Sequence, residues 1–207
     1  MENYLNEFML IAFAHFIALL SPGADFIYIV NSAINNKAKV AIGASLGIAL
    51  SNAFYITLCL FGYATIFSQS NLLISGIKII GGIYLLYLGI HILKSKSNNL
   101  AVKTIVTNKS TFKKELYRGF YLSFLNPKIS IFYISLFTLV VNKNTPWKIQ
   151  LFYGIWMALF VFIWDTLLIF LLNIKSIKKK ILSFTNLEKI LGSLLIIIGI
   201  GLLYSLF

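Results

Sequence analysis

Residues 18–30 read "ALLSPGADFIYIV", and here an apolar stretch is interrupted by a proline, a glycine and a carboxylate. These are Pro22, Gly23 and Asp25. In lipid, a helix break leaves backbone groups unpaired, so breaks persist only where they are buried in protein or line a wet cavity. An ionisable side chain inside the membrane is energetically costly, so it is a candidate functional residue. The stretch therefore predicts a polar site inside a membrane protein.

The composition also favours lipid as the solvent. The 207 residues are 59% hydrophobic and only 12% charged, with a mean hydropathy of +0.87, whereas a soluble domain carries about 25% charged residues. The N-terminus has Glu2 and Glu7 but no early Lys or Arg, so we expect no cleavable signal peptide. The single cysteine, Cys59, excludes an internal disulfide and a paired-cysteine redox motif.

Apolar runs and loop signals predict an all-α membrane protein with six transmembrane helices. The expected spans are 5–31, 40–67, 72–93, 115–141, 147–173 and 184–206. Thirteen Lys and Arg residues fall in or beside the loops of one side and two on the other. Because positive charge favours the cytoplasmic side, we expect both termini outside. The net charge of +12 then reflects topology, and we expect no nucleic-acid partner.

The two halves of the sequence resemble each other. "SPGADFIYIV" aligns with "NPKISIFYIS" on its proline, and "KIIGGIYLLYLGI" (78–90) parallels "KILGSLLIIIGIG" (189–201). We therefore divide the chain into a three-helix repeat at 1–93, a basic linker at 94–114 and a second repeat at 115–207. Because three crossings are an odd number, the second repeat must be inverted, and matched helix breaks in inverted repeats indicate a transporter site near the midplane.

The pairs Ser21-Pro22 and Asn126-Pro127 each combine a good N-cap residue with proline. Such a pair favours a helix start, so we expect the first and fourth spans to be interrupted at these prolines. Each proline also frees the carbonyl four residues earlier, which belongs to Ala18 or Ser123. Helix starts present free N–H groups that suit a carboxylate.

If the halves face each other, Asp25 and Lys128 approach one cavity, although a purely structural ion pair is the alternative. Asp165 is a second carboxyl in the membrane, and either carboxyl is a candidate proton carrier. Asn52 and Tyr55 line the path or form hydrogen bonds between helices. The candidate substrate-binding residues are Ser21, Pro22, Gly23, Asp25, Asn52, Tyr55, Asn126, Pro127 and Lys128.

Other features have structural interpretations. Gly43 and Gly47 form a small-xxx-small pattern, which predicts close helix packing. His15 and His91 are expected to be packed or interfacial, and no cluster of metal ligands stands out. No nucleophile is accompanied by a base, so we do not expect an enzyme or a bound cofactor.

Four segments carry a resemblance to the LysE/RhtB-type amino-acid exporters. They are "SPGADF", "GASLGIALSN", "KIIGGIYLLYLG" and "GFYLSFLNPKISIFY". The family's first motif is closer to P-G-P-[ND], and here Ala24 replaces the second proline. The resemblance implies an inner-membrane secondary transporter that exports amino acids or related small metabolites by proton antiport, as a homodimer.

Residues and resemblance together give one hypothesis for the mechanism. The two helix starts hold the carboxylate of an amino acid, Asp25 meets its ammonium, and protonation of Asp25 or Asp165 couples export to proton entry. The expected partners are the amino acid, protons, membrane lipids and a second copy of the chain. Three alternatives stay open: a metal or cation exporter, a thiol-redox carrier, for which the lone Cys59 lacks a pair, and a non-transporting membrane scaffold.

Overall fold

The computed structural model describes residues 2–20, 23–67, 71–94, 110–142, 144–172, 174 and 185–204. Within these ranges the regular structure is entirely helical, which confirms the predicted all-α class. The helices are α1 (Glu2–Leu20), α2 (Ala24–Asn35), α3 (Ala38–Phe67), α4 (Asn71–Lys94), α5 (Phe112–Phe124), α6 (Pro127–Val140), α7 (Trp147–Leu172) and α9 (Thr185–Tyr204). Ser21 and Pro22, and most of the predicted linker 94–114, lie outside the described residues.

Two stretches are each long and apolar enough to cross a membrane, namely Ala38–Gly62 of α3 and Trp147–Leu172, which is α7. Two bent pairs also qualify when each is treated as one span: α1 with α2, bent by 57°, and α5 with α6, bent by 60°. The predicted interruptions of the first and fourth spans thus coincide with real bends. The described residues support two to four spans by length and composition, and the six-span arrangement stays a prediction.

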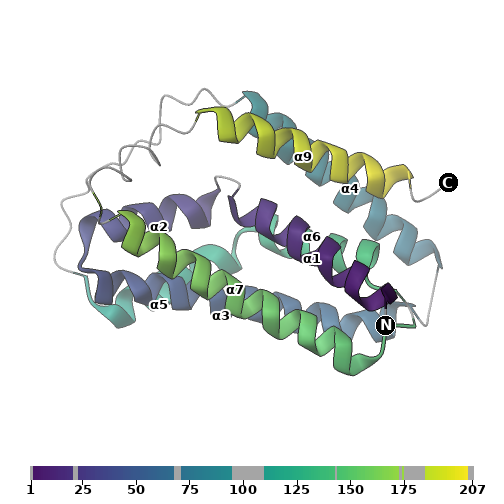
Figure 1. The fold of residues 1–207 in the computed structure, drawn as a ribbon, viewed down its shortest axis with the longest axis horizontal. Coiled ribbons are helices and arrows are strands. Elements are labelled where there is room, and N and C mark those ends of the chain that lie inside the picture. Colours follow the sequence, from purple (N-terminus) through teal and green to yellow (C-terminus); the bar gives the residue numbers. More distant parts are fainter. Residues whose placement is uncertain are drawn as a thin grey trace.

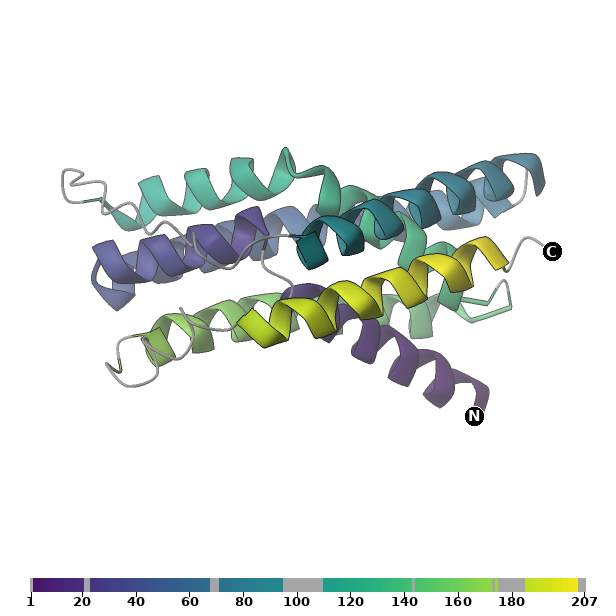
Figure 2. The ribbon, with the colours of Figure 1, turned by 90° about the horizontal axis from the view of Figure 1, so that it is seen from above.

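The helices run mainly along one direction, with α4 and α9 packed side by side as a separate layer (Figures 1 and 2). Helices α3 and α7 are antiparallel, because Ser45 near the start of α3 bonds to Thr166 late in α7, whereas Phe61 contacts Trp147. The described ends of the chain, in α1 and α9, lie at the same end of the molecule (Figure 1).

Exposed charged residues distinguish two opposite ends of the molecule, the basic end and the terminal end. The basic end holds the α2–α3 turn and the start of α5, where five exposed cationic residues lie: Lys37, Lys39, Lys113, Lys114 and Arg118. The terminal end holds the α6–α7 turn and the start of α1, and among its described residues Lys148 is exposed. The antiparallel pairing of α3 with α7 sets these ends apart.

Glycines bring α3 and α5 into backbone contact, which confirms the close packing predicted for Gly43 and Gly47. A Cβ atom on Gly43 would overlap the carbonyl oxygen of Phe112, and one on Gly47 the carbonyl oxygen of Leu116. From the other side, a Cβ atom on Gly119 of α5 would meet the carbonyl oxygen of Ala44 at 2.5 Å. This packing fixes α5, and therefore the α5–α6 bend, against the long helix α3.

Large apolar side chains cover the outer faces of the helices. On α1, Met9 and Phe13 are 61% and 60% exposed, and on α7, Leu159 and Ile163 are 55% and 58% exposed. Monomeric soluble proteins rarely expose continuous apolar faces of this kind. The outer surface is therefore that of a membrane protein, with lipid as the expected contact.

Candidate functional site

The start of α6 matches its prediction in detail. Asn126 is the N-cap, its Oδ1 accepts from the backbone N–H of Lys128 at 3.1 Å, and Pro127 follows as the first helical residue. A residue that accepts at the cap and a proline with a preset φ together favour a helix start here. The prolyl ring of Pro127 itself is exposed, so its role in the structure is to begin the helix.

The start of α2 differs from its prediction. The sequence places the cap at Ser21 and the first helical residue at Pro22, but α2 begins at Ala24 with Gly23 as its N-cap. Gly23 is extended (φ −141°, ψ −172°), and its carbonyl accepts the first helical hydrogen bond from Ile27 at 3.0 Å. A glycine has no side chain to cap the helix, so the first N–H groups of α2 have no side-chain cap.

Asp25 joins the two helix breaks directly. Its Oδ2 accepts from the hydroxyl of Ser123 at 2.9 Å, and its Oδ1 accepts from Nδ2 of Asn126 at 3.1 Å. Asn126 therefore has two functions, since its oxygen caps α6 and its nitrogen binds Asp25. A carboxylate in the first turn of a helix is also favoured by the helix dipole. The first turn of α2 is thus bound to the α5–α6 bend.

Lys128 satisfies the backbone at the other break. Its Nζ donates to the carbonyl oxygen of Ala18 at 3.2 Å, and this is the carbonyl that Pro22 is predicted to free. Lys128 also lies close enough to Asp25 for an electrostatic interaction. In the second break, the backbone N–H of Asn126 donates to the carbonyl of Ser123 at 3.1 Å. Each predicted orphan carbonyl therefore has a donor.

Replacing Lys128 with methionine is expected to destabilise the protein by about 1–3 kcal/mol, because the Ala18 carbonyl is then buried without its donor. Thermal unfolding of the purified protein in detergent measures the loss. Lys148→Met makes the same change at an exposed position and is the matched control, which we expect to unfold like the wild type. Equal unfolding of all three proteins would contradict the assigned role of the ammonium.

A small cavity of about 30 Å³ lies between the breaks. Five polar side chains from α2, α3, α6, α7 and the α5–α6 bend line it: Asp25, Asn52, Asn126, Lys128 and Asp165. Gly23 and six apolar residues complete the lining. The structure thus brings together six of the residues that sequence analysis singled out. A site for a small organic ligand is usually 300–1,000 Å³, so the cavity in this form is much smaller than one.

Asp165 differs from Asp25 in its surroundings. It is 6% exposed, and its Oδ2 is buried without a hydrogen-bond donor among the residues that the structure describes. Asp25, in contrast, has a donor on each oxygen. A buried carboxylate oxygen without a donor is costly in its charged form. The two carboxyls of the cavity are therefore suited to different tasks.

A chain of hydrogen bonds leads from Asp25 to the other side of the core. The hydroxyl of Ser123 accepts from Asn52 Nδ2 at 3.2 Å, and Asn52 Oδ1 accepts from Tyr133 at 2.8 Å. Tyr133 lies 3.0 Å from Nε2 of His15. Since the single hydroxyl proton of Tyr133 goes to Asn52, His15 donates through Nε2. Every donor in the chain therefore points toward Asp25, which stabilises its negative charge.

Sequence reasoning did not assign the roles of Ser123, Tyr133 and His15 in this chain. The only signal for Tyr133 is its match to Tyr28, six residues after the proline of each repeat. Tyr55, a predicted lining residue, is not among the described residues that line the cavity, and its hydroxyl donates to the carbonyl of Phe124 at 2.6 Å. It thus supports the last turn of α5.

The comparisons with known proteins agree with this picture. A family model described as "LysE type translocator" matches residues 16–206. A threonine efflux protein of Escherichia coli is 29% identical over 142 residues, which cover 68% of this chain and 69% of the relative. A leucine efflux protein of Salmonella choleraesuis is 29% identical over 145 residues, which cover 69% and 66%.

An uncharacterized membrane protein of Haemophilus influenzae is 32% identical over 145 residues, which cover 68% of this chain and 69% of the relative. No solved structure matches the chain. The family model includes both helix breaks and every described residue that lines the cavity. The chain therefore belongs to the LysE type translocator family, whose members are transporters and not enzymes.

Proposed function

We propose that this protein is a secondary transporter that exports amino acids or closely related small metabolites across the inner membrane by proton antiport. Two relatives are named for the efflux of threonine and of leucine. The observation that carries the proposal is the small cavity lined by Asp25 and Lys128, which lie in the first turns of α2 and α6. An amino acid is a zwitterion, so its binding site needs a negative partner for the ammonium and a positive partner for the carboxylate close together.

The two charges of an α-amino acid find complementary groups here. Asp25 receives the ammonium, since a carboxylate is the ordinary partner of a primary amine. The substrate carboxylate is placed at the first turn of α2, which has no side-chain cap and begins at the small residue Gly23. Free N–H groups and the positive helix end favour an anion there. Lys128 adds positive charge from α6.

Binding requires the cavity to widen, because about 30 Å³ has no room for an amino acid. The bends of 57° and 60° divide α1 from α2 and α5 from α6, and changes in these bends are the simplest way to open the cavity. Access then alternates between the basic end and the terminal end as one repeat rocks against the other, which is the usual motion of inverted-repeat transporters.

An inverted repeat is supported by how corresponding helices meet. In α4 and α9, Gly82 packs on Gly199 and Gly89 packs on Gly192, so the two helices are antiparallel. A shift of 110 residues, one less than the shift of 111 that aligns 78–90 with 189–201, exchanges these two contacts. Helices α3 and α7 are antiparallel as well. We propose that residues 1–93 and 115–207 form the two repeats, joined by 94–114, with six crossings.

The proposed orientation follows from the charge distribution. We propose that the basic end, with its exposed cationic residues, faces the cytoplasm and that both termini lie outside, because positive charge favours the cytoplasmic side. The exposed apolar faces of α1 and α7 contact lipid. We further propose that two copies of the chain assemble as a homodimer, as the resemblance to the exporter family implies.

Substitution of Asp165 by asparagine is expected to remove the proton coupling while export down a substrate gradient continues. Asp165 Oδ2 lacks a donor among the described residues, so this carboxyl is the one that gains most from holding a proton. Efflux from preloaded proteoliposomes, with and without an inward proton gradient, measures the coupling. Asp165→Glu keeps a titratable group and should keep part of it. Undiminished stimulation by the proton gradient in Asp165→Asn would show that another group carries the proton.

The transport function itself is tested by efflux of radiolabelled amino acids from proteoliposomes that contain the purified protein, beginning with threonine and leucine. We expect at least one amino acid to leave faster than from protein-free vesicles. Empty vesicles and vesicles with an unrelated membrane protein are the controls. Retention of all twenty amino acids and of divalent cations alike would favour the scaffold alternative, and release of cations alone the metal-exporter alternative.

A further inference from the structure

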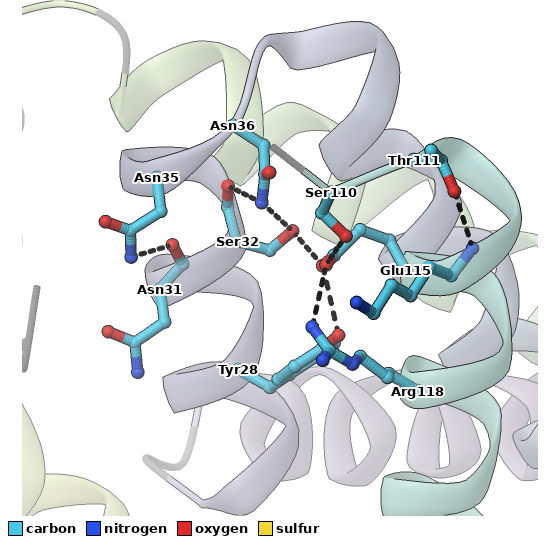
Figure 3. Close-up of polar contacts among 10 residues, drawn as sticks. Tyr28, Asn31, Ser32, Asn35, Asn36, Ser110, Thr111, Glu115 and Arg118 are labelled. Carbon is cyan, nitrogen blue, oxygen red and sulfur yellow. Dashed lines mark hydrogen bonds and ion pairs between the residues drawn. The ribbon is translucent and has the colours of Figure 1, made fainter. Parts of the chain in front are cut away.

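A second polar cluster lies at the basic end and is separate from the cavity. Its centre is Glu115, which is only 3% exposed and is joined to α2 by two hydroxyl groups (Figure 3). Tyr28 donates to its Oε2 at 3.0 Å and Ser32 to the same oxygen at 2.6 Å. Ser110 donates to Oε1 at 2.7 Å, and Arg118 lies 3.7 Å from that oxygen. A buried carboxylate with this many donors is fully paired.

This cluster and Asp25 belong to one polar seam between α2 and α5. Asp25, Tyr28 and Ser32 follow one another at spacings of three and four residues, so they share one face of α2. On α5, Glu115 and Ser123 are buried eight residues apart and therefore also share a face. Ser123 bonds to Asp25 at the cavity, and Glu115 bonds to Ser32 nearer the basic end.

The length of the seam follows from the helix rise. Seven residues of α2 separate Asp25 from Ser32, which corresponds to about 10 Å. The seam therefore leads from the cavity toward the turn that carries Lys37, where the chain meets water. The two helices that Glu115 joins are the ones that begin or end at the breaks beside Asp25. The contact of Glu115 with α2 therefore lies between the cavity and the basic end.

A matching carboxylate lies at the terminal end. Glu7 on α1 accepts from the hydroxyl of Thr145 at 2.9 Å, from the backbone N–H of Asn142 at 3.0 Å and from Tyr153 at 3.3 Å. These contacts join α1 to the α6–α7 turn and to α7. Glu7 and Glu115 each precede a helix break by three to four turns. The cavity thus has one acidic contact toward each end of the molecule.

We propose that Glu115, through Tyr28 and Ser32, is the gate that closes the route between the cavity and the basic end, and that Glu7 closes the opposite route. The proposal rests on the proposed transport function, which requires that the two routes open in turn. Glu115 acts without touching the amino acid in the cavity. Release of its bonds to α2 separates α2 from α5 and opens the seam as a path to Asp25.

The test measures from which side a cavity residue can be reached by a membrane-impermeant thiol reagent. A cysteine replaces Ile129, an apolar residue of the cavity lining, in a chain whose own cysteine is changed by Cys59→Ser. Two exposed positions mark the sides in separate variants, Lys37→Cys for the basic end and Asn144→Cys for the terminal end. The assay uses the full chain in sealed vesicles and no amino acid.

We expect Glu115→Gln to speed thiol modification at position 129 about 10-fold or more when the reagent is added at the basic end, which Lys37 marks. The reason is that the substitution weakens charge-assisted hydrogen bonds from Tyr28 and Ser32. Glu7→Gln should speed the modification from the Asn144 side. Equal rates with and without Glu115→Gln, or an equal increase from both sides, would overturn the gate, because loosening of the whole protein affects both sides alike.

Two further variants distinguish a gating role of the Glu115 cluster from a purely structural role. They also test the proposal if Glu115→Gln does not fold. Ser32→Ala removes a hydroxyl that bridges α2 to Glu115, whereas Ser110→Ala removes one that comes from the segment before α5 itself. Only Ser32→Ala should increase labelling from the basic end. Equal effects of the two variants would contradict the gate. Because labelling needs no substrate, failure of the gate and failure of the amino-acid export hypothesis give different results.

Discussion

Replacing Asp25 with asparagine is expected to abolish measurable export, with substrate affinity lowered about 10- to 100-fold, since a hydrogen bond to a charged group contributes roughly 1.5–3 kcal/mol. The change keeps the size of the side chain but removes the charge that meets the substrate ammonium. It also disturbs the cavity, because Ser123 and Asn126 both donate to Asp25 and an asparagine amide accepts at only one of its two ends. Efflux from preloaded proteoliposomes measures the result.

The control for this prediction is a change on the same helix away from the cavity. Asn35 is exposed on α2, and within the described part of the chain its side chain bonds only to the carbonyl of Asn31 in the same helix. Asn35→Ala should therefore transport like the wild type. Normal efflux by Asp25→Asn, with protein levels equal to those of the control, would exclude Asp25 as the ammonium partner and leave it a structural role.

Replacing Gly47 with alanine is expected to produce the largest loss of stability, at or above the upper end of the roughly 1–3 kcal/mol typical of overpacked sites. The added Cβ would overlap the carbonyl oxygen of Leu116 and lie 2.7 Å from the backbone nitrogen of Phe120. Backbone atoms of a packed helix cannot rotate away as a side chain does, so α5 must move from α3. We expect a lower melting temperature in detergent and reduced export, because α5 carries Ser123.

Gly76 provides a matched control for that change. A Cβ atom there has no neighbour within 4 Å, so Gly76→Ala should leave stability unchanged or raise it by about 0.5–1 kcal/mol, the usual gain of alanine over glycine in a helix. Opposite signs at two glycines of the same chain would identify helix contact as the cause. Equal melting temperatures for the two variants would mean that α3 and α5 are not in backbone contact.

Much of the fold depends on interactions between residues close in the chain, and these can be predicted from the sequence alone. The cap and proline of Asn126-Pro127 predict the helix start that is observed, because capping and the fixed φ of proline act within a few residues. The spacing of Gly43 and Gly47 predicts close packing for the same reason. The prediction for α2 was wrong by two residues, since Gly23 takes an extended conformation that delays the helix to Ala24.

The sequence predicted which residues form the site better than it predicted the hydrogen bonds that they make. Asp25, Asn52, Asn126, Lys128 and Asp165 line one cavity. The alignment of the two halves suggested this meeting for Asp25 and Lys128. The partner of the Lys128 ammonium, the Ala18 carbonyl, is 110 positions earlier in the chain, and no local rule pairs them. Glu115 gave no signal either, because its burial depends on the close approach of α2 to α5.

The sequence by itself determined that this chain is helical, that lipid suits its surface, and where two helices break, because hydrophobicity, capping and proline geometry act on near neighbours. Only the tertiary structure decided which hydrogen-bond donors reach Asp25 and that Asp165 Oδ2 lacks a donor among the described residues. It also decided that Glu115 is buried and hydrogen-bonded to α2. These outcomes depend on the rotation and depth at which distant helices pack, and a shift of one residue along a helix turns a side chain by about 100°.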